Sequence, residues 1–234
     1  MNIAELPWDS SLFNFKVGYI NLSKIIPEEL TQITSDANNR KFHLLYIFCK
    51  ERNTYSTINY PALIYTGQKT TFSKEINDDQ KIAFQIQEYT SEGTCPDELL
   101  ALAFLSGHFS RFKSDPNFKN DEFKKLYMQW IQKSISHEIA DIVFTFVINN
   151  KIVGFITLKI HNEVCDIGLI ATDSSLQGQG IGHQLILAAE HYAFNNKCSK
   201  LMVNTQRENK GAYAFYKSNG FTVYNTKEIY HLWL

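Results

Sequence analysis

The residues with the clearest chemistry lie in the segment SSLQGQGIGH, residues 174–183. An apolar run at residues 164–171 precedes it and predicts a strand, and apolar residues recur at helical spacing from Ile181 onward. Glycines let the backbone turn so that successive N–H groups face one ligand, and the start of a helix adds partial positive charge. The segment therefore predicts a site for a phosphate or a pyrophosphate.

The spacing of the glycines distinguishes between the known phosphate loops. A P-loop needs Lys and then Ser or Thr directly after its last glycine, whereas His183 follows Gly182 here. A dinucleotide-binding fingerprint needs a third glycine or alanine at a fixed offset, which this segment lacks. The pattern that fits is Gln-x-x-Gly-x-Gly, at Gln177, Gly180 and Gly182. It resembles the coenzyme A pyrophosphate loop of the GNAT superfamily of N-acyltransferases; an ordinary glycine turn before a helix is the alternative.

The composition restricts the classes of protein that this chain can represent. With 234 residues, of which 44% are hydrophobic, it can bury a full core in one large domain or two small ones. A net charge of −1 gives no electrostatic footprint for nucleic acid or an anionic membrane. No apolar run approaches the roughly 20 residues of a spanning helix, and the N-terminus lacks the layout of a signal peptide. We expect a cytoplasmic protein with no nucleic-acid partner and no membrane insertion.

The cysteines and histidines form no metal-binding pattern. The four cysteines are scattered without a Cys-x-x-Cys pair, and the seven histidines show no spacing typical of metal ligands. Scattered cysteines in a chain without a signal peptide indicate reduced thiols. We therefore expect no metal cofactor.

The first part of the chain, residues 1–80, predicts a small N-terminal α/β domain. Its predicted elements alternate between strands and a helix, which is typical of that fold class. Two further strands, at residues 61–66 and 70–72, are expected at the edge of its sheet. No catalytic arrangement is visible in this part.

The second part, residues 81–234, gives a strand, two helices, three strands, a helix, a strand, a helix and two final strands, at 221–224 and 228–233. This order resembles the GNAT fold, and the glycine-rich segment falls between the fourth strand and the third helix, as in that family. The resemblance implies an α/β fold with a mixed central sheet whose fourth and fifth strands splay apart. It also implies a catalytic domain that moves an acyl group from acetyl-CoA, or another acyl-CoA, directly to an amine.

The resemblance further implies which residues contact the cofactor. In that family the pantetheine pairs with the exposed backbone of the fourth strand, which assigns the contact to Ile170, Ala171 and Thr172. A plain core strand is the alternative for these three. The pyrophosphate loop corresponds to Gln177, Gly178, Gln179, Gly180, Ile181, Gly182 and His183. Many GNAT members have an arginine where this chain has Gln177, so the loop keeps a hydrogen-bonding side chain but lacks that charge.

The segment NKGAYAFYKSNGF, residues 209–221, resembles the closing motif of the same family. There the Asn, here Asn209 with Ala212 beside it, touches the pantetheine, and the Tyr, here Tyr216, protonates the leaving thiolate as general acid. A Tyr seven residues after a helix-capping Asn lies about two turns along the same face, so one helix can present both. The alternative is that Asn209 only caps the helix and Tyr216 only packs against Phe215.

The resemblance extends beyond the superfamily to the dTDP-fucosamine acetyltransferase group, in segments at residues 8–13, 110–116, 126–131, 166–170, 205–209 and 230–234. It implies that the acceptor is a nucleotide-linked (dTDP) amino-deoxysugar used in surface polysaccharide biosynthesis, bound by Ser110, Arg111 and Phe112. A guanidinium binds phosphate oxygens in a bidentate manner, so Arg111 suits the diphosphate. The alternative for Arg111 is a surface ion pair with Asp115.

Several alternatives stay open at this stage. His108 and His231 are candidate general bases, as is a relay through water. The acceptor could be a protein N-terminus or another small amine, and the chain could be a non-catalytic module that binds coenzyme A. The sequence does not specify the sugar, the length of the acyl group or the oligomeric state, a homodimer among them.

Overall fold

The computed structural model describes residues 2–52, 60–77, 83, 85–90 and 93–234. The strands are β1 (Ala4–Glu5), β2 (Val17–Leu22), β3 (Leu44–Cys49), β4 (Leu63–Glu75), β5 (Ile86–Glu88), β6 (Ile142–Ile148), β7 (Lys151–His161), β8 (Val164–Thr172), β9 (Lys200–Gln206) and β10 (Thr222–Trp233). The helices are α1 (Pro7–Phe13), α2 (Pro27–Asn39), α3 (Asp97–Ser106), α4 (Arg111–Ser114), α5 (Glu122–Ile135), α6 (Ile181–Asn195) and α7 (Lys210–Ser218), with a 3-10 turn, η2 (Ser174–Leu176). No helix within these ranges is long and apolar enough to cross a membrane.

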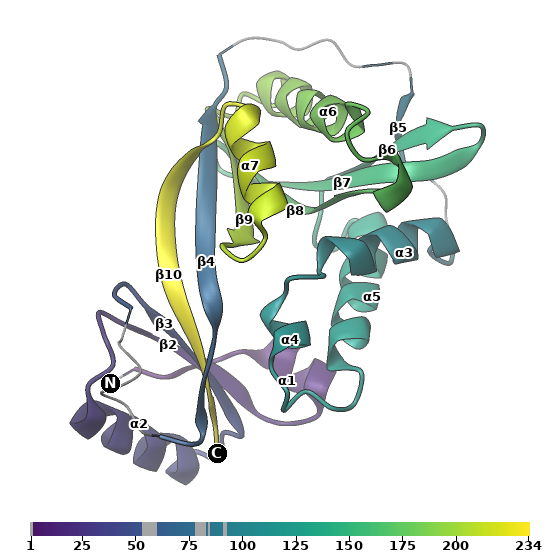
Figure 1. Cartoon of the computed structure of the whole chain (residues 1–234). Coiled ribbons are helices and arrows are strands. Elements are labelled where there is room, and N and C mark those ends of the chain that lie inside the picture. Colours follow the sequence, from purple (N-terminus) through teal and green to yellow (C-terminus); the bar gives the residue numbers. More distant parts are fainter. Residues whose placement is uncertain (1, 53–59, 78–82, 84, 91–92) are drawn as a thin grey trace.

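In the part of the chain that the structure describes, all strands belong to one mixed sheet (Figure 1). Its order is β1-β2-β3-β10-β4-β9-β8-β7-β6-β5. The pairs β2–β3 and β8–β9 are parallel, and the other neighbours are antiparallel. The predicted α/β fold with a mixed central sheet is confirmed. The sheet runs through both predicted units, and the boundary between residues 80 and 81 stays a prediction.

Strand β4 lies in the middle of this sheet. It pairs with β10 on one side and with β9 on the other, antiparallel to both. The prediction of two short edge strands, at residues 61–66 and 70–72, is wrong, because one strand of 13 residues runs from Leu63 to Glu75 through both. Both of its neighbours come from the C-terminal part of the chain, so no local pattern could reveal its central position.

The chain ends in one long strand instead of the predicted pair at 221–224 and 228–233. In Figure 1, β10 curves along the whole length of β4. The expected link between the two strands continues the ladder, since Asn225, Thr226 and Lys227 pair with residues of β4. The pairing of β10 with β4 shifts register between Val223 and Asn225, close to where the sequence pattern predicted the end of a strand. The strand continues through this irregularity.

Helices cover both faces of the sheet, and alternate residues of β6 show the division. Phe144 and Phe146 belong to the core under α6, whereas Val143 packs in a second core with Leu99 of α3 and Ile131 of α5. Such alternation is the expected result of a strand whose successive side chains point to opposite faces. The glycine-rich segment therefore leads into a helix that is fixed against the sheet.

The second core also contains side chains from the N-terminal part of the chain. Phe13 of α1 and Tyr46 of β3 belong to it, and their rings lie 5.9 and 6.1 Å from the ring of Phe112. Residues on both sides of the predicted boundary thus share one hydrophobic core. This packing places α1 and α4 beside the central strands that carry the candidate site.

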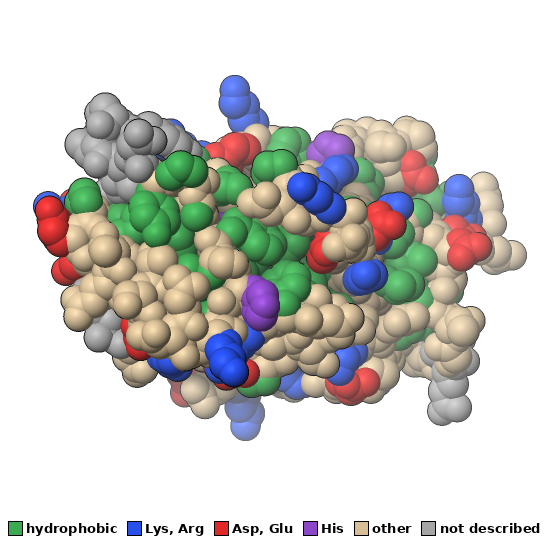
Figure 2. All heavy atoms as spheres, turned by 90° about the horizontal axis from the view of Figure 1, so that it is seen from below, with side chains coloured by type: hydrophobic (Ala, Val, Ile, Leu, Met, Phe, Trp, Pro, Cys, Tyr) green, Lys and Arg blue, Asp and Glu red, His purple; other side chains and the backbone are tan. Residues whose placement is uncertain are grey.

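Charged side chains are interspersed on the face shown in Figure 2. Basic and acidic groups lie among hydrophobic ones there, and neither sign dominates that face. This distribution agrees with the net charge of −1. The face offers no extended positive field of the kind that attracts nucleic acid.

Candidate functional site

The site begins where β8 and β9 separate. The two strands pair from Val164–Lys200 to Ile167–Val203 and no further. Beyond that point β9 continues only with β4, so the end of β8 has no partner strand on this side. The predicted splay of the fourth and fifth strands of the second unit is confirmed, and it leaves backbone groups of β8 open to a ligand.

A bulge in β8 coincides with the separation. Leu158 of β7 pairs with Ile167 and Ile156 with Ile170, so two residues of β8 oppose Thr157 alone. The Leu169 N–H donates to the Thr157 hydroxyl at 2.9 Å. A Cβ at position 168 would lie 2.8 Å from that hydroxyl oxygen, which explains the glycine there. Because a bulge re-aims the strand, this one turns the end of β8 away from β9.

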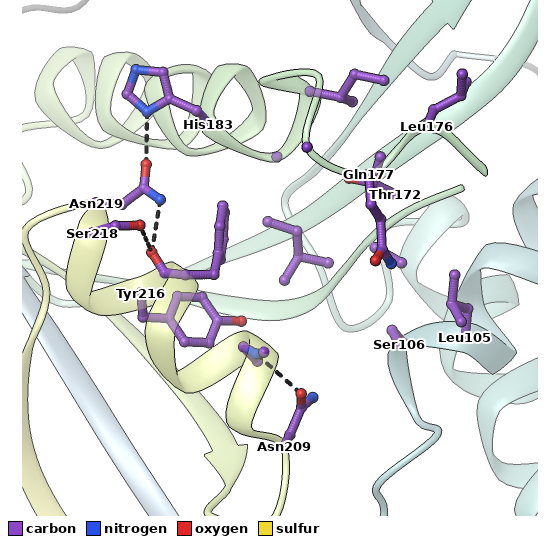
Figure 3. A pocket seen from close by; sticks show the side chains of 18 of the residues that line it. Leu105, Ser106, Thr172, Leu176, Gln177, His183, Asn209, Tyr216, Ser218 and Asn219 are labelled. Carbon is purple, nitrogen blue, oxygen red and sulfur yellow. Dashed lines mark hydrogen bonds between the residues drawn. The ribbon is translucent and has the colours of Figure 1, made fainter. Parts of the chain in front are cut away.

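A cavity of about 850 Å³ lies between the end of β8, the glycine loop and α7 (Figure 3). It is lined by most of the residues that the sequence assigns to the cofactor: Ile170, Ala171, Thr172, Gln177, Gly178, Gly180, Ile181, Gly182, His183, Asn209 and Ala212. Tyr216 lines it as well, whereas Gln179 does not. The structure thus brings the predicted residues together, and their roles stay predictions.

The glycine loop presents an array of backbone donors. Gly178 and Gly180 have φ angles of 79° and 83°, a left-handed conformation that suits glycine. Within the described chain, none of the backbone N–H groups of residues 177–183 has an acceptor. Unpartnered N–H groups around a helix start form a nest for an anion, and the helix dipole adds to it. This donor set fits the oxygens of a diphosphate.

The loop is held against α7 from the other side. A Cβ at Gly182 would lie 3.0 Å from the ring of Phe215, so the first turn of α6 packs directly on α7. The side chains of His183 and Asn219 are joined by a hydrogen bond of 2.7 Å, visible in Figure 3. These contacts fix the nest relative to the helix that carries Tyr216.

Asn209 and Tyr216 lie on the same helix, as predicted, and both line the cavity. The Asn209 side-chain oxygen accepts the Ala212 N–H at 3.0 Å and caps α7. The ring of Tyr216 is buried against Phe72 and Phe221, yet among the described residues its hydroxyl has no hydrogen-bond partner. Burial raises the pKa of Tyr216, so the phenol stays protonated at neutral pH.

A second cavity, of about 570 Å³, adjoins the first. Ser106, Phe109, Ile170, Asn209, Ala212 and Tyr216 line both. The outer walls of the second cavity carry charged side chains from four elements: Asp9, Lys69, Arg111 and Asp166. Tyr216 therefore stands at the junction of a cavity with a backbone anion nest and a cavity with charged walls.

The three residues predicted to bind the acceptor all line the second cavity, but Phe112 does so from the core. It is only 9% exposed and packs against Phe13 and Phe118. Other aromatic rings therefore cover most of Phe112, and its contact with the acceptor stays a prediction. Ser110 accepts the Phe112 N–H at 3.2 Å and so fixes the start of α4.

The alternative interpretation of Arg111, a surface ion pair with Asp115, is also wrong. Asp115 is buried and accepts hydrogen bonds from His231 Nδ1 at 2.5 Å and Trp233 Nε1 at 3.0 Å. The Arg111 guanidinium instead lies 4.1 Å from the ring centre of Tyr46, and its Nε is buried without a partner. Arg111 thus borders the second cavity with unused donor capacity.

The two histidines proposed as bases differ in position. His231 is fully buried and lines neither cavity, so a role as general base at this site is wrong. Burial lowers its pKa to about 4 although Asp115 acts in the opposite direction. His108 lines the first cavity, with its Nδ1 2.9 Å from the Lys113 ammonium.

The buried His231 makes stability depend on pH. Its Nε2 has no acceptor, so the folded state resists a second ring proton, whereas the unfolded chain accepts one below pH 6.5. The unfolded state then binds more protons, so we expect the free energy of unfolding to fall by roughly 3 kcal/mol as the pH drops from about 6.5 to about 4. Urea unfolding across this range measures it.

The control for this pH dependence is His231→Asn, which keeps an N–H donor for Asp115 but cannot titrate. Its stability should change less across the same pH range. Burial alone would raise the pKa of Asp115, but its hydrogen bonds from His231, Asn117 and Trp233 hold it below 3.8, so its own contribution is lost only at lower pH. A wild-type profile that is flat between pH 6.5 and 4 would contradict the assignment.

Comparison with known families agrees with this geometry. Residues 107–221, which include the separated strand, the glycine loop and α7, match the model of the Acetyltransferase (GNAT) family. The chain carries a GNAT acetyltransferase domain. It is 30% identical over 158 residues to the uncharacterized N-acetyltransferase MJ1207 of Methanocaldococcus jannaschii, a match that covers 64% of this chain and 66% of that protein.

Another relative of this GNAT domain is the mycothiol acetyltransferase of Corynebacterium glutamicum, 28% identical over 100 residues. That match covers 42% of this chain and 34% of the relative, so this chain spans about a third of that protein. Among solved structures, a functionally unknown conserved protein from Staphylococcus epidermidis superposes with a TM-score of 0.59 at 12% identity, covering 94% of this chain and 85% of that one. A GCN5-related N-acetyltransferase from Sphaerobacter thermophilus gives 0.57 at 12%, covering 87% and 66%. These structures support the GNAT fold.

Sequence reasoning missed several residues of the two cavities. Leu105, at the end of α3, and Lys69 of β4 carry no local signal, because only the packed fold brings them to the site. Asp9 and Asp166 fell within segments that resemble the sugar-nucleotide group, without a role assigned to either. A residue pair that meets across strands of different units cannot be found from spacing alone.

Proposed function

We propose that this protein is an N-acetyltransferase that moves the acyl group of acetyl-CoA, or another acyl-CoA, directly to the amine of a small acceptor. The observation that carries the proposal is the array of unpartnered N–H groups at residues 177–183, in one cavity with the unpartnered hydroxyl of Tyr216. The family assignment supports it.

Each part of the first cavity has a role in this proposal. The N–H groups of Gln177, Gly178, Gln179, Gly180, Ile181, Gly182 and His183 hold the diphosphate. The backbone of Ile170, Ala171 and Thr172 pairs with the pantetheine, and Asn209 and Ala212 contact it from α7. Acetyl-CoA, when bound, supplies a thioester whose carbonyl is open to attack. Backbone N–H groups at the end of β8 are the donors suited to the charge that develops on that carbonyl.

Tyr216 acts as the general acid in this proposal. Its pKa is raised by burial, so its Oη carries a proton at neutral pH. That proton is available to a thiolate leaving in the first cavity, and proton transfer from a positioned side chain contributes roughly 100- to 10,000-fold in rate. The amine must reach the junction in its neutral form from the second cavity, where Tyr216 also lies. The proton that its nitrogen loses on forming the amide passes to water, from which Tyr216 is reprotonated.

We propose a dTDP-linked amino-deoxysugar as the acceptor. The resemblance of the segments listed above to the dTDP-fucosamine acetyltransferase group supports this choice, as does the unpartnered Nε of Arg111 beside the second cavity. A guanidinium with unused donors suits a diphosphate. A non-catalytic module that binds coenzyme A is the alternative, and turnover distinguishes the two.

The test is a free-thiol release assay on the full chain, with acetyl-CoA and longer acyl-CoA donors and with a panel of dTDP-amino sugars. We expect thiol release that depends on both substrates and an acylated sugar in the mass spectrum. Binding of coenzyme A without turnover of any amine in the panel, protein N-termini and polyamines included, would favour the non-catalytic module. No binding of coenzyme A would reject the proposal altogether.

A further inference from the structure

The second cavity contains two cations that form no ion pair with a carboxylate of the described chain. Lys69 reaches it from β4, and Arg111 reaches it from the start of α4. Neither forms an ion pair within 4.0 Å in the described chain. Arg111 retains a buried Nε without a partner. Half-buried cations are normally paired, so two unpaired cations in one cavity point to a ligand that supplies the missing charge.

The two cations influence each other. Burial lowers the pKa of Lys69, and the charges of Arg111 and Lys227 lower it further. Lys227 lies opposite Lys69 on β10, but its ammonium donates to Asn21 at 3.1 Å and it does not line the cavity. Like charges close together destabilise each other, and an anion between Lys69 and Arg111 would relieve that repulsion.

Two carboxylates share the cavity. Asp9 already accepts a hydrogen bond from the Tyr46 hydroxyl at 3.0 Å. Asp166 lies near enough to Lys69 to raise the pKa of that lysine slightly, but it is not within ion-pair distance. The donors of Lys69 and Arg111 therefore stay unused by either acid. The amino group of an acceptor would therefore meet the carboxylates of Asp9 and Asp166 on the walls of the same cavity.

We propose that Lys69 and Arg111 form an anion-binding pair, so that the enzyme selects amines that also carry a phosphate or a carboxylate. This inference rests on the proposed function, because it specifies the class of amine that accepts the acetyl group. It adds Lys69, from the N-terminal part of the chain, as a residue that determines acceptor specificity. Planar Arg and compact Lys together suit an anion with several oxygens.

The experiment is a calorimetric titration of the full chain, saturated with coenzyme A so that the glycine loop is occupied. Pyrophosphate and malonate serve as the phosphate and carboxylate probes. We expect at least one to bind, and Lys69→Met and Arg111→Met each to weaken that binding at least roughly tenfold. The probe that binds more tightly identifies the kind of anion on the acceptor. Coenzyme A binding in the same sample reports that each variant is folded, and Lys69→Gln replaces Lys69→Met if it is not.

The matched control is Lys227→Met, which removes the same charge from the facing strand without changing the cavity wall. It should weaken binding of the probe much less than Lys69→Met does, because Lys227 does not line the cavity and its ammonium is engaged by Asn21. Failure of both probes to bind wild type, or equal losses in Lys69→Met and Lys227→Met, would overturn the inference.

A kinetic readout separates this inference from the proposed function. With a dTDP-amino sugar that is turned over, Lys69→Met should raise KM at least roughly tenfold and leave kcat within about twofold, because the anion lies away from the reacting amine. Anion binding without acetyl transfer would reject the proposed function but keep the anion site. Acetyl transfer with an unchanged KM in Lys69→Met would reject the anion site but keep the function.

Discussion

Gly180→Val should raise the dissociation constant for coenzyme A at least roughly tenfold, which corresponds to about 1.4 kcal/mol. Gly180 precedes the first residue of α6 with a φ of 83°. A β-branched residue is a genuine outlier there, and the left-handed region costs most residues roughly 1–2 kcal/mol. The loop must change its conformation to relieve this strain, and the N–H groups then no longer converge. Calorimetric titration of coenzyme A into the full chain measures the effect.

The cause of this effect is the backbone and not crowding, because a Cβ at Gly180 would meet no atom within 4 Å. The control is Gly211→Ala in α7, a glycine that lines the same cavity without a positive φ. Its added Cβ would lie 3.8 Å from Asn209 Oδ1, an ordinary contact, so binding should stay within about twofold. Gly180→Asn, which tolerates the left-handed conformation better, should fall between the two. Wild-type affinity in Gly180→Val would remove the loop from the binding site.

Tyr216→Phe should lower kcat at least roughly tenfold and leave coenzyme A affinity within about twofold, in line with the contribution of a general acid. The substitution removes only a hydroxyl without a partner in the described chain, so the ring keeps its packing against Phe72 and Phe221. Stability should therefore be nearly unchanged, since the hydroxyl faces the cavities and no hydrogen bond within the described chain is lost. Thiol release gives kcat, and calorimetry gives the affinity.

The matched control for Tyr216 lies on the same helix. Tyr213 packs on Phe72 with ring centres 4.9 Å apart and lines neither cavity. Tyr213→Phe should therefore retain wild-type kcat. If Tyr216→Phe is fully active, or if both variants lose activity equally, the phenol at 216 does not deliver the proton.

Local patterns predicted the parts of the site that are themselves local. The glycine loop and the helix cap at Asn209 depend on residues within one segment, so their sequence is sufficient to indicate them. These predictions needed no knowledge of which strands would pair.

The errors concern contacts between distant segments. The sequence of β4 reads as two short strands, and its central position depends on β9 and β10, which only the folded chain supplies. Phe112 is predicted only as a residue that binds the acceptor, and its packing against Phe13 of α1 depends on the folded chain. Lys69 could not be placed in the second cavity for the same reason. Pairing across the sheet is the step that local periodicity does not encode.

The central position of β4 has a consequence for how the chain is made. During synthesis β4 emerges long before the strands on either side of it, since Thr71 and Asn204, which are hydrogen-bonded across β4 and β9, lie 133 residues apart. Contacts of this range slow folding and leave the early strand with open edges. Chaperone dependence and sensitivity to the rate of translation should therefore concentrate on residues 63–75. For the same reason, expression of the matched region 107–221 alone would leave only the contiguous strands β6–β9, with the edge of β9 that β4 normally covers open.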